Sequence, residues 1–228
     1  MVAVRPTPAP AVRAVIFDMD GVLTDSEPLI NEAAVRMFRE RGVPVQPEDF
    51  LPFVGTGEDR YIGGVAEKHG VELDLAEAKR RTYEIYLELA PRKLRAFPGA
   101  VETVHACREA GLAVAVASSA DRVKVRANLT LIGLPPESWH AVVTAEDVRH
   151  KKPAPDLFLA AACKLGIPPG ACVVIEDAPS GIQAALAAGM RCVAVAQTFG
   201  PDRLRQAHRV RSSLRELALK DLTDWPAG

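Results

Sequence analysis

The chain has 228 residues, of which 48% are hydrophobic and 25% are charged, a composition typical of a globular protein with a sizeable buried core. The formal net charge of −1 argues against a nucleic-acid partner and against binding to an anionic membrane surface. The longest apolar runs, such as Leu112 to Ala117, are too short to span a bilayer. We therefore expect neither nucleic acid nor membrane as a partner.

The first ten residues contain three prolines and no apolar segment of the kind found in secretion signals, which predicts a flexible tail over 1–10. The four cysteines are scattered, and no two of them have the C-x-x-C spacing of zinc or redox sites. Dispersed free thiols are typical of a reducing compartment, so we expect a cytoplasmic protein.

The first buried strand is predicted at Val12–Phe17, and the next convincing strand begins only at Ala113. The interval between them has helical periodicity instead, in three segments: Pro28–Arg41, Asp59–His69 and Leu75–Leu89. We therefore predict a helical cap domain over 27–91, inserted after the first strand of a core domain that comprises 11–26 and 92–228.

Beyond the cap, short apolar runs alternate with helical patterns. Further strands are predicted at Ala113–Ser118, Ala141–Thr144, Cys172–Ile175 and Cys192–Ala196, and helices at Ala100–Ala110, Arg122–Ile132, Pro155–Leu165 and Ser180–Ala188. Strands that are apolar throughout are typical of a parallel sheet covered on both faces. We therefore predict an α/β fold with a Rossmann-like, doubly wound parallel sheet. The amphipathic stretch from Asp202 onward predicts one or two terminal helices.

Side chains that directly follow the strands are candidates for a site, because ligands bind at the carboxyl ends of strands in open parallel sheets. Asp18 and Asp20 follow the first strand and alternate around Met19. A bare pair of aspartates is common in turns, but this pair ends a buried strand and continues through Gly21 into a specific string, G-V-L-T-D-S.

Two adjacent acids, Glu176 and Asp177, follow the fourth strand. Capping of the next helix would explain one of them but not both. Acids gathered near Asp18 repel one another unless a cation neutralises them. Oxygen donors without clustered histidine or cysteine favour Mg²⁺.

Hydroxyl and cationic groups follow the second and third strands. Ser118 and Ser119 offer hydroxyls and backbone amides that suit phosphate oxygens, although Ser119 also suits a helix N-cap. Lys151 and Lys152 precede a rigid Pro-x-Pro stretch, which favours a fixed ammonium for phosphate over a solvated loop lysine. Together with the acids, these groups predict an anion-and-metal site.

In this order, the motifs resemble those of haloacid-dehalogenase-superfamily phosphatases, in the β-phosphoglucomutase-like subgroup with a helical cap. The matching positions are Asp18-x-Asp20-Gly21-Val22, Ser118, Lys152 before Pro153, and Glu176-Asp177. The stretches 54–58 and 117–122 are also similar to the phosphatase domain of a plant chloroplast protein that carries thioredoxin and NHL-repeat domains. The resemblance implies a phosphatase that acts on a small phosphorylated metabolite, such as a sugar phosphate, with Mg²⁺ as cofactor.

The resemblance also implies a mechanism. Asp18 would attack the phosphorus atom and form an aspartyl-phosphate, and Asp20 would protonate the leaving oxygen and then activate water. Mg²⁺ would be bound by Asp18, by Asp20 through its backbone carbonyl and by Asp177, with Glu176 as a further ligand or close by.

The same resemblance assigns the phosphate-binding groups. Phosphate oxygens would be bound by Ser118, Ser119 and Lys152. Lys152 would also act as the catalytic lysine, because it directly precedes the proline of the motif.

Glu58, Arg60 and Lys79 are the candidates in the cap for contacting the leaving group, and a solvated helix charge would explain at least one of them. A phosphosugar mutase of the β-phosphoglucomutase type is the alternative function. Glu58 stands where such mutases place an arginine for a second phosphate, but the nearby Arg60 leaves the alternative open. A non-catalytic regulatory or binding domain is disfavoured because both motif aspartates are present. The substrate and the oligomeric state stay open.

Overall fold

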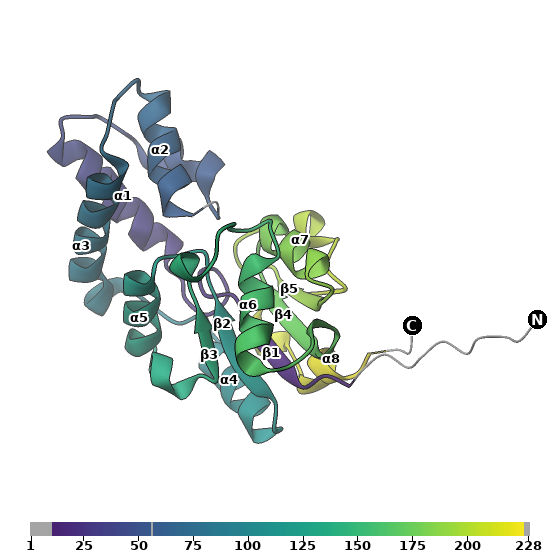
Figure 1. Ribbon diagram of the computed structural model, residues 1–228. Coiled ribbons are helices and arrows are strands. Elements are labelled where there is room, and N and C mark those ends of the chain that lie inside the picture. The colour runs from purple at the N-terminus through teal and green to yellow at the C-terminus, as the bar shows by residue number, and fades with distance from the viewer. Residues whose placement is uncertain (1–10, 56, 226–228) are drawn as a thin grey trace, which may run out of the picture.

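A computed structural model describes residues 11–55 and 57–225 and contains one six-stranded sheet in the order β3-β2-β1-β4-β5-β6 (Figure 1). All paired strands are parallel. The strands are β1 (Ala14–Phe17), β2 (Ala113–Ala117), β3 (Ala141–Val143), β4 (Cys172–Glu176), β5 (Arg191–Val195) and β6 (Arg209–Arg211). The predicted doubly wound α/β fold is confirmed, whereas the predicted tail at 1–10 lies outside the described residues.

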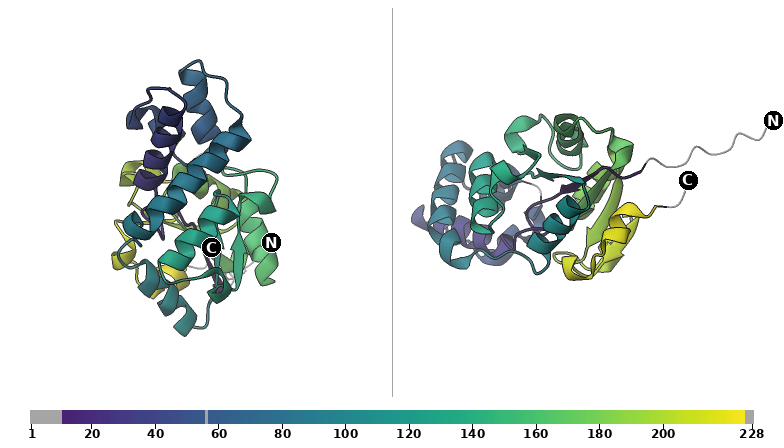
Figure 2. Two further views of the ribbon diagram at one scale, coloured as in Figure 1. Left: turned by 90° about the vertical axis from the view of Figure 1, so that its left-hand side faces the viewer. Right: turned by 90° about the horizontal axis from the view of Figure 1, so that it is seen from below.

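Helices cover both faces of the sheet (Figure 2). On one face lie α6 (Asp156–Leu165) and α7 (Pro179–Ala187), and on the other lie α4 (Ala100–Glu109), α5 (Arg122–Leu131) and α8 (Leu219–Thr223). Because both faces are covered, every side chain of β1 is fully buried, which explains its wholly apolar sequence. Within residues 11–55 and 57–225, none of the helices combines the length and apolar character needed to cross a lipid bilayer.

Short 3-10 helices connect several of these elements: η1 (Pro47–Phe53), η2 (Pro136–Ser138), η3 (Ala145–Asp147), η4 (Pro169–Ala171), η5 (Pro201–Leu204) and η6 (Leu214–Glu216).

The C-terminal segment differs from its prediction of one or two helices. It contains two 3-10 helices and the short α8, but it also adds strand β6, which pairs with β5. The strand has no apolar run because it lies at the edge of the sheet and its three side chains are only half-buried. Arg211 instead ion-pairs with Asp221 of α8 at 2.6 Å, which ties the edge strand to the last helix.

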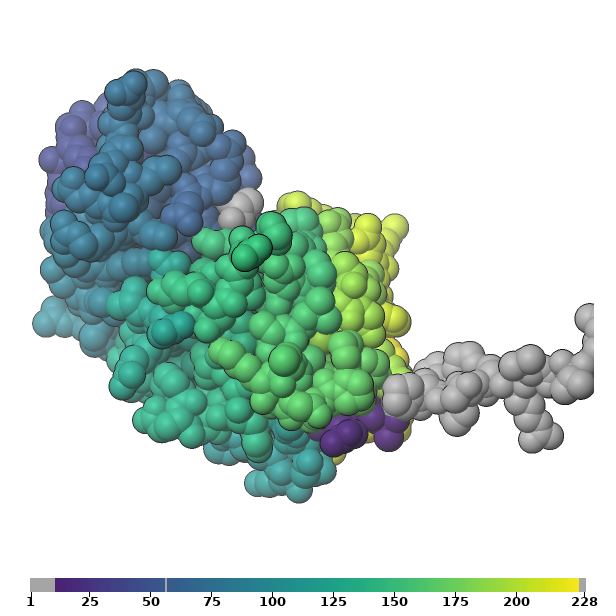
Figure 3. Space-filling view, viewed as in Figure 1, coloured from purple at the N-terminus to yellow at the C-terminus, as the bar shows by residue number. Residues whose placement is uncertain are grey.

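The interval between β1 and β2 is helical, as predicted. It contains α1 (Glu27–Glu40), η1, α2 (Glu58–Lys68) and α3 (Leu75–Lys93), which we call the cap helices. They pack around an apolar cluster of their own, in which the rings of Phe38 and Phe50 meet edge to face. In the space-filling view they form a lobe beside the sheet and its helices (Figure 3). The last turn of α3 runs to Lys93, two residues past the predicted boundary at 91.

The chain enters and leaves the cap helices along two segments that are hydrogen-bonded to each other. The amide of Asp25 donates to the carbonyl of Arg95, and the amide of Phe97 donates to the carbonyl of Leu23, both at 3.0 Å. Thr24 and Ala96 form an antiparallel bridge between these bonds. The paired connections hold the start of α1 directly beside the carboxyl end of β1.

The apolar cluster of the cap helices predicts a large difference between two substitutions. Phe38→Ala should lower the free energy of unfolding by about 3–5 kcal/mol, because it leaves a cavity where a fully buried ring packs against Phe50. Leu51→Ala should change it by no more than about 0.5 kcal/mol, because Leu51 is 66% exposed. Urea unfolding of both variants measures the difference, and equal effects would contradict the packing described.

Candidate active site

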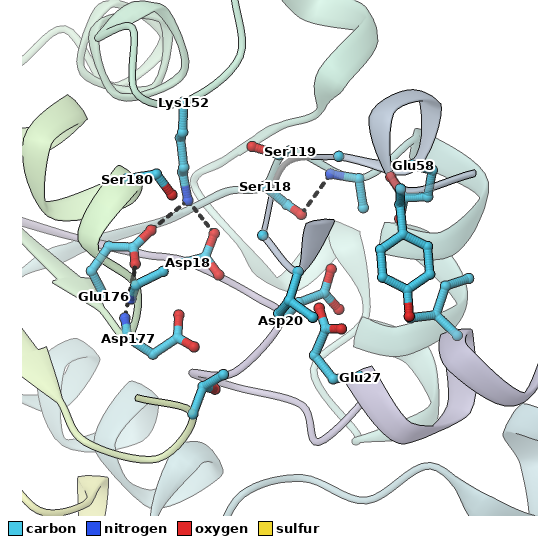
Figure 4. Close-up of a pocket in the computed structure, with 18 of the residues that line it drawn as sticks. Asp18, Asp20, Glu27, Glu58, Ser118, Ser119, Lys152, Glu176, Asp177 and Ser180 are labelled. Atoms are coloured by element: carbon cyan, nitrogen blue, oxygen red, sulfur yellow. Dashed lines mark hydrogen bonds and ion pairs between the residues drawn. The ribbon is translucent and has the colours of Figure 1, made fainter. Parts of the chain in front are cut away.

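The carboxyl edge of the sheet positions the predicted site residues through backbone hydrogen bonds that continue the strand pairing. The amide of Asp18 donates to the carbonyl of Ile175 in β4, and the amide of Ser118 donates to the carbonyl of Val143 in β3, both at 3.0 Å. Asp18 and Ser118 are almost fully buried. The strand pairing thus fixes the first residue after β1 and β2, and their side chains converge on one cavity (Figure 4).

Lys152 is the cation at the centre of this edge. Its ammonium contacts Asp18 Oδ1 and lies 2.7 Å from Glu176 Oε1, and its side chain is 5% exposed (Figure 4). Burial alone would lower the pKa of Lys152, but Asp18 and Glu176 more than offset this effect and raise the pKa above its usual value. Lys152 therefore stays charged. Lys151 points elsewhere and ion-pairs with Asp59 of α2 at 3.1 Å.

Both carboxylate oxygens of Glu176 have donors in the structure. Oε1 accepts from Lys152, and Oε2 accepts from the backbone amides of Asp177 and Ala178, each at 2.8 Å. The side chain fits closely against α7, because a Cβ atom on Gly181 would lie 1.7 Å from Glu176 Oε1. Glu176 thus joins the lysine to the start of α7.

Asp18, Glu176 and Asp177 each offer an oxygen atom within 4.8 Å of the others. Burial raises the pKa of Asp18 to about 7, with Lys152 opposing and Glu176 adding to the effect. Burial, Glu176 and Asp18 raise the pKa of Asp177 well above its usual range. Among the described residues, Lys152 is the only ammonium in contact with this trio. Three crowded carboxylates with a single ammonium beside them leave excess negative charge, which fits a hard divalent cation such as Mg²⁺.

The two serines line the cavity from the β2 side. Ser118 Oγ accepts a hydrogen bond from the amide of Ala120 at 3.1 Å, so its own proton is free to point into the cavity. Ser119 Oγ is buried and has no hydrogen-bond partner in the part of the chain that the structure describes. An unpartnered buried hydroxyl at this edge is suited to an incoming oxyanion.

Asp20 lies beside the first residue of α1. Its Oδ1 accepts from Ser26 Oγ, and its side chain is 17% exposed. Glu27 is half-buried, and its carboxylate lies near that of Asp20 in the close-up (Figure 4). Burial raises the pKa of Glu27 to about 7, against the opposing effect of Lys124.

Of the three candidates in the cap, the structure places Glu58 in the cavity and Arg60 and Lys79 outside the residues that line it. The Arg60 side chain stacks over the ring of Phe53 and ion-pairs with Glu67. Arg60 lies two positions after Glu58 on α2, so its side chain points to the opposite side of the helix. Lys79 ion-pairs with Asp59 and Asp121 at 2.8 and 3.0 Å. Neither of these two side chains lines the cavity in this structure.

The sequence reasoning missed several cavity residues, of which Lys124 of α5 is the most buried charged one. Glu27 and Tyr61, from cap helices, also line the cavity. The signal for Lys124 is its position directly before Val125 and one helical turn before Asn128, on the face of α5 that also carries Leu129.

Gln197, which follows β5, supports the first motif rather than the cavity. Its Nε2 donates to the carbonyl of Gly21 at 2.8 Å and to that of Val22 at 3.2 Å. Gly21 has φ +84°, and a Cβ atom there would lie 2.0 Å from Asp177 Oδ2. The turn after Asp20 can therefore approach Asp177 only because this residue is glycine.

Comparisons with known proteins agree with this geometry. SUPPRESSOR OF QUENCHING 1, chloroplastic, from Arabidopsis thaliana is 50% identical over 216 residues, which are 92% of this chain but 20% of that protein. The chain thus spans only a fifth of the length of that relative. Hexitol phosphatase B from Escherichia coli strain K12 is 33% identical over 223 residues, covering 92% of this chain and 96% of that protein.

A crystal structure of CbbY from Rhodobacter sphaeroides in complex with phosphate superposes with a TM-score of 0.81 at 27% identity, covering 92% of this chain and 99% of that one. Residues 12–189 match the family model for haloacid dehalogenase-like hydrolases. The chain therefore belongs to the haloacid dehalogenase-like hydrolase family.

Proposed function

We propose that this protein is a Mg²⁺-dependent phosphatase that hydrolyses a small phosphomonoester through an aspartyl-phosphate on Asp18. The observation that carries the proposal is the contact of the Lys152 ammonium with Asp18 and Glu176, opposite two serine hydroxyls in the same cavity. A nucleophile, a fixed cation and oxyanion donors thus meet in one place. The phosphatase names of the curated relatives support the same activity.

In the first step, a carboxylate oxygen of Asp18 forms a bond to phosphorus while the bond from phosphorus to the ester oxygen breaks. Asp20 transfers its proton to that oxygen, which leaves as an alcohol. In the second step, Asp20 takes a proton from water, and the water oxygen attacks phosphorus and releases Asp18 and inorganic phosphate. Asp20 lines the same cavity as Asp18, which supports this role.

The phosphate group would be held by Ser118, Ser119 and Lys152. The Ser119 hydroxyl supports this role, because it is buried without a partner among the described residues. Lys152 would neutralise part of the charge on both the nucleophile and the phosphate.

Asp18 and Asp177 would hold the ion through their carboxylates, and Asp20 through its backbone carbonyl. Glu176 would act through Lys152, because both of its oxygens already have donors. When bound, the ion supplies positive charge that offsets the repulsion between Asp18 and the phosphate.

The side of the cavity that faces the cap helices would receive the leaving group. Its charged members are Glu27, Glu58 and Lys124, and the charge on Lys124 is already neutralised by Asp20 and Glu58. Glu58 Oε2 is buried without a donor among the described residues. This side therefore favours a neutral, hydroxyl-bearing leaving group, such as that of a sugar or polyol phosphate, over one that carries a second phosphate.

The cytoplasmic location stays part of the proposal. It rests on four cysteines that are all free thiols in the structure. The plant relative carries the word chloroplastic in its name, which says nothing of this chain's own compartment.

A mutase is the second candidate, since a putative beta-phosphoglucomutase from Thermotoga maritima is among the structural neighbours of the chain. A mutase must hold a second phosphate, and no cation that is free of ion pairs lines the cap side of the cavity within the described residues. The proposal of hydrolysis is therefore preferred.

The first prediction concerns the nucleophile. Asp18→Asn should lower phosphate release from a panel of phosphorylated metabolites by at least about a thousandfold, because an amide cannot form the phosphoenzyme. Asp25→Asn is the matched control, since Asp25 lies in the same motif but is exposed. Phosphate release with Mg²⁺ measures both variants. Unchanged activity in Asp18→Asn, or a wild type inactive on every substrate, would refute the proposal.

The second prediction concerns the metal. Gly21→Ala should weaken Mg²⁺ binding by at least about tenfold, because the added methyl group displaces the Asp177 carboxylate. Gly70→Ala introduces a side chain at a similar φ, +64°, with nothing within 4 Å, so Mg²⁺ affinity should stay the same. Isothermal titration calorimetry with Mg²⁺ compares the two. Equal affinities in both variants would place the metal elsewhere.

The third prediction concerns a second phosphate. The kcat/KM for fructose 6-phosphate should exceed that for fructose 1,6-bisphosphate by about tenfold or more, because Glu27 and Glu58 repel the added charge. Glu58→Gln should narrow the ratio. A preference for the bisphosphate, or conversion of β-glucose 1-phosphate to glucose 6-phosphate without phosphate loss, would favour the mutase.

A further inference from the structure

Lys124 is a buried lysine on helix α5, with a side chain that is 2% exposed. Its ammonium lies 2.9 Å from Asp20 Oδ2 and 3.3 Å from Glu58 Oε1. Asp20 belongs to the edge of the sheet, whereas Glu58 is the first residue of cap helix α2. One ammonium therefore joins the two lobes of the molecule inside the cavity.

A second residue of α5 contacts the other carboxylate oxygen of Asp20. Asn128, one helical turn further along α5, lies with its Nδ2 3.4 Å from Asp20 Oδ1. Asn128 Oδ1 in turn accepts from the hydroxyl of Tyr86 in cap helix α3 at 2.7 Å. The Lys124 ammonium also lies 5.6 Å from the centre of the Tyr86 ring. Helix α5 thus contacts both oxygens of the Asp20 carboxylate, and both side chains that do so, Lys124 and Asn128, have partners in the cap helices.

A buried ammonium is stable only when carboxylates or other acceptors surround it. Burial would lower the pKa of Lys124, but Asp20 and Glu58 raise it well above its usual value, so the side chain is charged. One of the two carboxylates that pair with Lys124, that of Glu58, belongs to cap helix α2. The charge of Lys124 is therefore fully compensated only when the cap helices are seated on the sheet edge.

We propose that Lys124 is a positioning residue that couples the seating of the cap helices to the orientation of the Asp20 carboxylate. With Glu58 in place, the ammonium is fixed between two carboxylates and holds Asp20 Oδ2 in one position. Without Glu58, the same ammonium is free to follow Asp20, and the direction in which Asp20 presents its proton is lost. The inference rests on the proposed phosphatase function, in which Asp20 protonates the leaving oxygen.

The test compares two phosphate esters whose leaving groups differ in whether they must be protonated as they depart. Benzyl phosphate releases a strongly basic alkoxide and requires protonation, whereas p-nitrophenyl phosphate releases a stable phenolate and does not. Lys124→Met keeps the length of the apolar stem and removes the charge. It should lower kcat/KM for benzyl phosphate by about 30-fold or more and leave that for p-nitrophenyl phosphate within about threefold. A lysine that only supports the fold would lower both equally.

Three further variants separate positioning from folding. Lys124→Arg, which keeps the charge, should restore much of the activity toward benzyl phosphate. Glu58→Gln should lower kcat/KM for benzyl phosphate by a smaller factor and should likewise leave that for p-nitrophenyl phosphate nearly unchanged. Tyr83→Phe is the matched control, because it removes another contact between a cap helix and the start of α5, the bond from the Asp121 amide to the Tyr83 hydroxyl, without touching Asp20. It should leave the ratio of the two esters unchanged.

A distance measurement tests the coupling without turnover. Spin labels at the exposed native Cys163 on α6 and at Glu67→Cys on α2 report the position of α2 relative to the core helices. In the otherwise unchanged full chain, pulsed electron resonance should give a single narrow distance distribution. Lys124→Met should broaden it or shift it to longer distances.

The outcomes are distinct. If the wild type hydrolyses neither ester, the spin-label distances alone decide the coupling, and the proposed function fails only if the wild type is also inactive on the whole metabolite panel. If the wild type is active and Lys124→Met affects both esters equally, or Tyr83→Phe changes the ratio as strongly, the positioning role is wrong. If the distance distribution of Lys124→Met matches that of the wild type, the coupling to the cap helices is wrong.

Discussion

The site depends on one imbalance of charge: three buried carboxylates, those of Asp18, Glu176 and Asp177, lie around the ammonium of Lys152, the only one in contact with them in the described part of the chain. The surrounding backbone is arranged to tolerate it. Glu176 turns one oxygen to two amides at the start of α7. Gly21 and Gly181 lack the side chains that would occupy the space of the acids. The remaining deficit of positive charge is the property that makes this edge of the sheet attractive to a divalent cation.

The sequence was sufficient for the parts of the site that follow from local pattern. Asp18 directly follows the wholly apolar strand β1, and Asp177 directly follows β4, whose first four residues are apolar and whose last is Glu176. The strand pattern alone therefore places these acids at one edge. The parallel sheet with helices on both faces follows from the same runs. The family resemblance then distinguished Lys152 from its neighbour Lys151, and the structure separates the two side chains in the same way.

The features that were missed depend on partners far away in the sequence. Strand β6 contains two arginines, and its assignment requires the neighbouring β5 and the ion pair with Asp221. In the sequence, Lys124 has the pattern of an ordinary helix lysine, and its ion pairs with Asp20 and Glu58 become visible only in the folded structure. Arg60 lies close to Glu58 in the sequence, but two positions along a helix turn its side chain away from Glu58, and it ion-pairs with Glu67 instead.

The pairing of β1 also has a consequence for how the chain acquires its structure during synthesis. Ala14 pairs with Ala113 on one side and with Cys172 on the other, so both neighbours of β1 are translated long after it. The cap helices, whose apolar cluster lies within one continuous segment, are complete before either neighbour exists. Local contacts form faster than distant strand pairs, so the nascent chain carries a folded helical lobe beside an unpaired apolar strand. Strand β1, which directly precedes Asp18, is therefore the segment that a ribosome-bound intermediate most needs to shield from other chains.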